Sequence, residues 1–185
     1  MVLMVLETEA LTDAQLPVEQ LAAHLRLAEG YATVPGQDAR LRQRLRGAIG
    51  MVERRLGKVM IAREVVLCGP SEGSDRIALP VAPVTDVLSV SEMRDGQTTA
   101  IVGARVEEDP ETPCLVLPHT VSTGAVLQVT LWAGWGTWDT LPDPMCQAVL
   151  LTAEGLDSGD ISAVMPMIET LLAPWRVRRL GRAAL

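Results

Sequence analysis

Hydrophobic residues recur at intervals of three and four in the N-terminal third of the chain. Between residues 38 and 57 the recurring positions are Leu41, Leu45, Ala48, Ile49, Val52 and Leu56. One face of an α-helix collects residues at this spacing, so the pattern predicts a long amphipathic helix that ends at Gly57. A shorter helix is expected over about residues 18–28, after a loose arm or short strand at residues 1–15.

After Met60 the pattern changes to short runs of β-branched and apolar residues, separated by glycine and proline. Such runs predict strands. We expect them at residues 63–67, 76–79, 84–93, 98–102, 114–117 and 126–132. The Asp95-Gly96 pair between two of these runs is typical of a tight hairpin turn.

The last of these strands opens the stretch around which we expect the fold to be organised, residues 126–151. Gly134 and Gly136 should end the strand, since glycine adopts backbone angles that other residues resist, and Trp132 is expected in the core. Asp143 and Pro144 then fit the N-cap and first position of a helix. This helix is apolar on nearly every side, which predicts burial in the protein or at a subunit contact.

A final helix is expected over about residues 161–173, between a polar break at 157–160 and Pro174. Two helices, a run of strands and two more helices predict an α+β fold. It would be a helical framework, with two N-terminal and two C-terminal helices, that carries an inserted small antiparallel β subdomain. Within a single domain, 1–185, the expected parts are 16–58 (helical), 60–134 (β), 142–174 (helical) and a C-terminal arm, 175–185.

Composition narrows the function classes. The formal net charge of -7 argues against a sequence-independent nucleic-acid binder, because such a protein needs a basic surface to release counterions from phosphates. The three cysteines form no C-x-x-C pair and neither histidine has a second ligand at metal spacing, so we expect no metal and no cofactor. Residues 1–6 lack a basic flank and no apolar run could span a bilayer, so we expect neither a signal peptide nor a membrane partner.

An enzyme is the alternative that the acidic run Glu107–Glu111 keeps open. Paired carboxylates, with a histidine, could perform acid–base chemistry in a small cytoplasmic enzyme. The density of charge and the prolines in this run favour a solvated loop. No nucleophile or phosphate-binding motif occurs, so we expect no catalytic residues and no enzymatic activity.

Arginines and tryptophans are the candidate contact residues. The long helix carries Arg40, Arg42, Arg44, Arg46, Arg54 and Arg55. They fit a solvated face and equally a contact with acidic groups of another subunit or partner, and an arginine-rich helix could also serve a regulatory binding module. Trp135 and Trp138, after the last strand, either cover a core edge or anchor a partner.

The segment after Pro174 is the best candidate for binding. It contains Trp175, Arg176, Val177, Arg178, Arg179, Leu180 and Arg182. A frayed basic end seldom carries tryptophan, valine and leucine at this density. We therefore expect an arm that becomes ordered on a partner.

Three segments resemble the head–tail connector (adaptor) proteins of tailed phages and gene transfer agents. The first is the Ala-Gly-Trp-Gly strand end at 133–136, followed by a proline-rich turn and a helix that opens near Gln147. The second is 16–27, which contains the His-Leu-Arg triplet of the family's first helix. The third is 171–180, where Trp175 follows Leu-Leu-Ala-Pro as in the family's closing segment. The motifs occur in the family's order and span most of the chain.

This resemblance implies a structural role without chemistry. An adaptor forms a homo-oligomeric ring, commonly a dodecamer that matches the portal, and docks on the portal protein at the capsid vertex. It connects head to tail, presents a platform to a stopper or other tail-side neck protein, and lets DNA pass through its channel without specific binding. We accordingly expect assembly in the host cytoplasm, a location in the neck of a virion or gene transfer agent particle, and portal binding by the arm.

Overall fold

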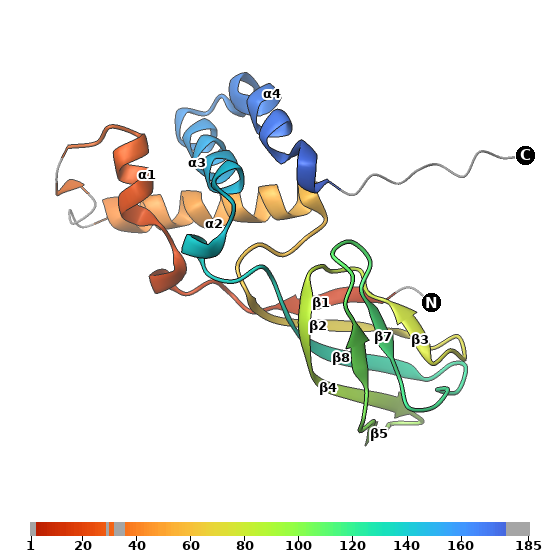
Figure 1. Cartoon of the computed structure of the whole chain (residues 1–185). Coiled ribbons are helices and arrows are strands. Elements are labelled where there is room, and N and C mark those ends of the chain that lie inside the picture. Colours follow the sequence, from red (N-terminus) through yellow and green to blue (C-terminus); the bar gives the residue numbers. More distant parts are fainter. Residues whose placement is uncertain (1–2, 29, 32–35, 177–185) are drawn as a thin grey trace, which may run out of the picture. The chain divides into compact units, whose positions relative to one another are not determined.

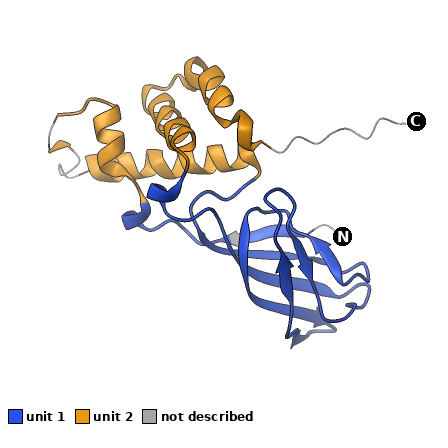
Figure 2. Ribbon diagram, viewed as in Figure 1, with its two compact units in different colours: residues 1–15, 58–141 blue, residues 16–57, 142–185 orange. Residues whose placement is uncertain are grey.

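The structure, a computed structural model, describes residues 3–28, 30–31 and 36–176. It confirms the α+β class expected from the sequence. The chain divides into two compact units, shown in Figure 2: residues 1–15 with 58–141, and residues 16–57 with 142–185. The first unit is built from strands, and the second from helices that come from both ends of the chain.

Two antiparallel sheets form the first unit (Figure 1). The larger has the strand order β1 (Met4–Thr8), β2 (Arg63–Pro70), β8 (Val126–Ala133), β4 (Val84–Arg94) and β5 (Gln97–Ala100). The smaller has the order β3 (Arg76–Ala78), β7 (Cys114–Val116) and β6 (Arg105–Glu107). The sequence pattern missed β6, because its three residues alternate two charges with one valine and no apolar run marks them.

The core of this unit lies on one face of the larger sheet. In β2 and β8 every second side chain is buried, and the register pairs Leu67 with Val129. Ile77 and Leu115 of the smaller sheet belong to the same buried cluster. The prediction that Trp132 lies in the core is wrong: its side chain is 40% exposed. Strand side chains alternate between faces, and Leu131 on one side of it already faces inward.

Four α-helices make up the described part of the second unit: α1 (Val18–His24), α2 (Gln37–Leu56), α3 (Asp143–Ser158) and α4 (Ile161–Leu172). The predicted apolar stripe of α2 is buried along its whole length. The helix α3 packs against α1, α2 and α4, which explains why it is apolar nearly all round (Figure 1). The first helix is shorter than expected, because Arg26 takes up a left-handed backbone conformation (φ 54°).

Helix ends differ in part from the sequence prediction. Pro142 occupies the cap of α3 without a side-chain hydrogen bond, so Asp143 is the first helical residue and does not act as the cap. Pro144 still lies in the first turn, where its missing N–H costs nothing. Between α3 and α4, Asp160 is a true N-cap, since its carboxylate accepts a hydrogen bond from the Ala163 N–H at 3.2 Å.

Candidate functional site

The Ala-Gly-Trp-Gly strand end is held by backbone hydrogen bonds to the segment just before β2. The Trp135 N–H donates to the Met60 carbonyl (2.9 Å), and the Ala62 N–H donates to the Gly136 carbonyl (2.7 Å). A Cβ added to Gly134, whose φ is 128°, would lie 2.6 Å from the Ala62 Cα. The motif therefore needs glycine because two backbone segments cross there in contact.

The two tryptophans that follow β8, Trp135 and Trp138, have different surroundings. Trp138 begins the short 3-10 turn η3 (Trp138–Thr140) and is 7% exposed, so little of its ring is left for a partner. Trp135 is half-buried, and the Lys58 Nζ lies 5.5 Å from the centroid of its ring. This distance suits a cation–π contact, and the exposed part of Trp135 remains available as a contact surface.

Arginines of α2 bind carboxylates of the other helices in their own unit. Arg40 and Arg44 both approach the Asp157 carboxylate, at 2.7 and 3.6 Å, and Arg55 lies 3.0 Å from Glu169. Asp157 is in the last turn of α3, where the helix dipole disfavours a negative charge, so the two arginines offset an unfavourable position. Because these pairs are partly exposed, each contributes about 0–1 kcal/mol.

The sequence reveals one acidic partner of the α2 arginines, Asp38, but not the other two, Asp157 and Glu169. Asp38 and Arg42, 2.7 Å apart, are four positions apart on one helix, and that spacing is readable directly. Asp157 and Glu169 lie more than 100 positions from their arginines, so only the packed helices reveal the pairs. Arg54, in contrast, is exposed and remains a candidate for contact with another chain.

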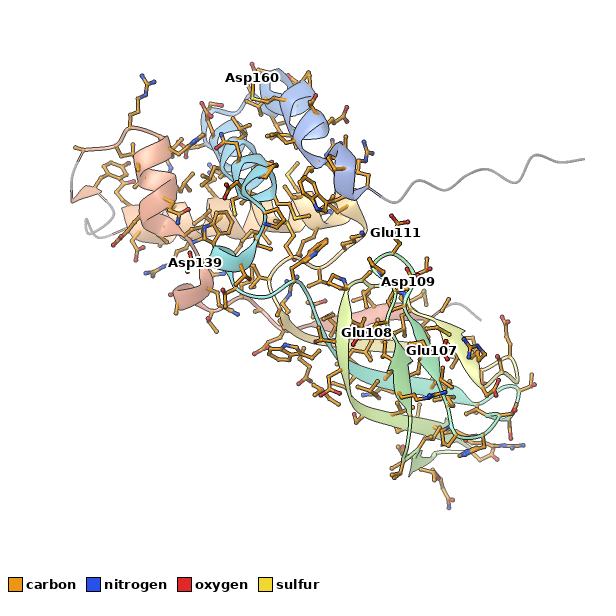
Figure 3. The ribbon with its side chains drawn as sticks, viewed as in Figure 1. Glu107, Glu108, Asp109, Glu111, Asp139 and Asp160 are labelled. Atoms are coloured by element: carbon orange, nitrogen blue, oxygen red, sulfur yellow. The ribbon has the colours of Figure 1, made fainter. Side chains whose placement is uncertain are left out.

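The acidic run begins at Glu107, the last residue of β6, and continues as a charged surface loop (Figure 3). Glu107 forms a bidentate ion pair with Arg76, and the hydrogen bonds of this pair lower the pKa of Glu107 and raise the pKa of Arg76. Asp109 accepts backbone hydrogen bonds from Thr112 and Glu111, and these lower the pKa of Asp109. A carboxylate that acts as a general acid–base catalyst at neutral pH needs a pKa raised towards 7. The lowered pKa values of Glu107 and Asp109 are therefore shifted in the wrong direction for catalysis.

One histidine is paired within the helical unit and the other is a surface residue. His24 Nε2 lies 2.9 Å from Glu154 Oε2 within the helical unit, and His119 is exposed. In residues 3–28, 30–31 and 36–176 no three His, Cys, Asp or Glu side chains gather as a metal site would require. Nor does the described part of the chain contain a helix with the length and apolar character needed to cross a bilayer.

The C-terminal arm lies mostly outside the described residues. Trp175 ends the 3-10 turn η4 (Ala173–Trp175), which extends α4, and is half-buried; Arg176 follows it and is exposed. The other arm residues named above, Val177, Arg178, Arg179, Leu180 and Arg182, are not among those that the structure describes.

Comparison with known structures identifies the fold. The chain is 31% identical to a protein in the neck of an empty gene transfer agent (GTA) particle with C6 symmetry, at a TM-score of 0.80 over 100% of both chains. It is 30% identical to a protein of the native GTA virion, at a TM-score of 0.77 over 98% of both chains. A third match, in the neck of the native GTA particle with C12 symmetry, has 30% identity and a TM-score of 0.73 over 100% of both chains.

This chain belongs to the head–tail connector family. The family predicted from the three motifs is thus confirmed, although no protein-family profile and no curated protein matches the sequence. As a connector, it has a structural role in a particle neck and is not an enzyme. The acidic loop accordingly needs no catalytic explanation.

Proposed function

We propose that this connector forms a ring that docks on the portal at the capsid vertex and joins the head to the tail around the DNA channel. The observation that carries the proposal is full-length similarity to proteins in GTA particle necks. The tail side of the ring would present a platform to a stopper or another neck protein. Assembly would take place in the host cytoplasm, before the particle is complete.

A ring is the assembly that the relatives' symmetry favours. Their neck structures have C6 and C12 symmetry, and a cyclic ring is built from one repeated contact between two different surfaces of the subunit. A dodecamer would match a twelvefold portal subunit for subunit. Exposed groups on α2 such as Arg54, and the free side of Trp135, are candidates for contacts between subunits or with the next neck protein.

The C-terminal arm is our candidate for the portal anchor. Its described start is half-buried Trp175 and exposed Arg176, directly after α4. The sequence beyond adds Arg178, Arg179 and Arg182 among apolar residues. Aromatic and arginine side chains supply a large share of interface energy, with about 2 kcal/mol or more for each hot spot, which is roughly thirtyfold in affinity.

The test is a truncation that removes residues 177–185 and keeps Trp175 in its turn. Capture on immobilised purified portal and a thermal melt would be measured for the full chain and the truncated chain. We expect an unchanged melting temperature and a loss of capture of at least roughly thirtyfold. Arg94→Ser serves as a control, because it removes an exposed arginine at the end of β4, in the other unit, and should leave capture unchanged.

Two results would contradict the proposal. Equal capture of the truncated and full chains would show that the arm is not the anchor. A clear fall in the melting temperature would show that residues 177–185 belong to the fold and that lost capture reports unfolding.

A further inference from the structure

The helix α4 has an exposed face without charge, which we call the α4 face: Ala163, Pro166, Met167 and Thr170. These residues lie three, four and seven positions apart, so they share one side of the helix. All four are exposed, and Met167 is 58% exposed. Over residues 161–175 the only charged side chain is Glu169, and it is paired with Arg55 of α2.

The opposite side of α4 is already used by the packing of its own unit. Ile168 and Leu172 are buried, and α4 packs against α3 (Figure 1). Contact is so close that a Cβ on Gly155 of α3 would lie 2.9 Å from the Cα of Ile161. The α4 face therefore points away from the helix on which α4 rests, and nothing in the described part of the chain covers it.

The composition of this face is that of an interface core and differs from that of a free surface. Charged residues are depleted and methionine is enriched in the core of protein–protein interfaces. The exposed acidic loop of the other unit shows the contrast, since it includes Glu108, Asp109 and Glu111. Pro166 inside α4 is a further sign, because an internal proline destabilises a helix and leaves an apolar ring where a polar residue would keep the helix soluble.

We infer that the α4 face packs against a second copy of this chain and forms one half of the repeated contact in the ring. This inference rests on the ring of the proposed function. The contact in a cyclic ring is heterologous, which means that two different surfaces of the subunit meet. One surface of each subunit is therefore covered by the neighbour on one side, and a second surface by the neighbour on the other. An uncharged helix face, continuous with the turn that leads to the arm, meets this requirement in the unit from which the arm begins.

The test places one carboxylate in the contact, with Met167→Glu and Ala163→Glu as independent variants. Position 163 is the third residue of α4 after the Asp160 cap, where glutamate stabilises a helix, so Ala163→Glu cannot act by unfolding α4. The control is Met4→Glu on β1, because Met4 is 66% exposed and undergoes the same change in the other unit. Particle masses would be measured across a concentration series, with and without purified portal, alongside thermal melts.

We expect the parent and Met4→Glu to form the same ring. At concentrations at which the parent is a monomer, both α4 variants should have its melting temperature or a higher one. Both should need at least roughly tenfold more protein than the parent to assemble. Rings from Met167→Glu and Ala163→Glu at parental concentration would overturn the inference and leave the proposed ring intact. If those rings then fail to bind portal, the α4 face belongs to the portal contact. A parent that stays monomeric even on portal would refute the ring and the inference together.

Discussion

Gly134→Ala is the substitution that tests most directly why the Ala-Gly-Trp-Gly strand end exists. The backbone at Gly134 has φ 128°, a conformation that residues with a Cβ rarely adopt. The new Cβ would lie 2.6 Å from the Ala62 Cα, 2.7 Å from the Ala62 nitrogen and 2.9 Å from the Ile61 carbonyl carbon. All three are backbone atoms, so no side-chain rotation can relieve the overlap.

The expected cost follows from this geometry. Holding a non-glycine residue in a sparsely populated backbone region costs about 1–3 kcal/mol. Moving the segments apart would also weaken the two hydrogen bonds that join Trp135 to Met60 and Ala62 to Gly136, each worth about 0.5–1.5 kcal/mol. The sum is about 2–6 kcal/mol, a large share of the roughly 5–15 kcal/mol that stabilises an ordinary domain.

Denaturant unfolding followed by tryptophan fluorescence is the assay, because Trp132, Trp135 and Trp138 all lie in the same unit as Gly134. Gly124→Ala is the matched control. Gly124 has φ 86° and flanks the other end of β8, but nothing lies within 4 Å of its added Cβ. The control should lose only the cost of the left-handed conformation, about 1–2 kcal/mol. Equal losses in the two variants would refute the idea that backbone crossing requires Gly134.

Three further predictions concern the helical unit and the channel. Leu150→Asp should abolish soluble folding, because a charge placed on the buried side of α3 costs about 3–5 kcal/mol or more. Asp160→Ala should lower the melting temperature at pH 7, but less as the pH falls below 3.8. Hydrogen bonds from Ser162 and Ala163 lower the pKa of Asp160 below its ordinary value of 3.8. The Asp160 carboxylate therefore stabilises the folded chain above pH 3.8, and this stabilisation is lost as the pH falls through the lowered pKa. Duplex DNA should bind no tighter than about 10⁻⁴–10⁻⁶ M at physiological salt.

Each of these has a direct control or contradicting result. Gln147→Asp, on the exposed side of α3, should fold normally, and a Leu150→Asp variant that melts with it would show that α3 is not buried. If the difference in melting temperature between the parent and Asp160→Ala grows as the pH falls, the prediction for Asp160 is wrong. A gel shift with nanomolar protein would contradict a channel that lets DNA slide.

Much of this protein is determined by local sequence. The three- and four-residue spacing of Leu41, Leu45 and their equivalents sufficed to place α2, because a helix repeats every 3.6 residues whatever surrounds it. Gly57, Gly134 and Gly159 mark the ends of α2, β8 and α3. Each has a positive φ, which glycine adopts more easily than other residues, so the residue type itself indicates the end. The order of elements then predicted the α+β class, and three short motifs predicted the connector family.

Tertiary structure decided what depends on distant parts of the chain. Whether Trp132 faces in or out is a question of strand register, which the neighbouring strands set and a run of apolar residues leaves open. The arginines of α2 look alike in sequence, yet Asp157 and Glu169 reach them only because α3 and α4 pack beside α2. The α4 face is defined in the same way: every residue of this apolar helix is a candidate for burial, and only the packing against α3 shows which side is left exposed.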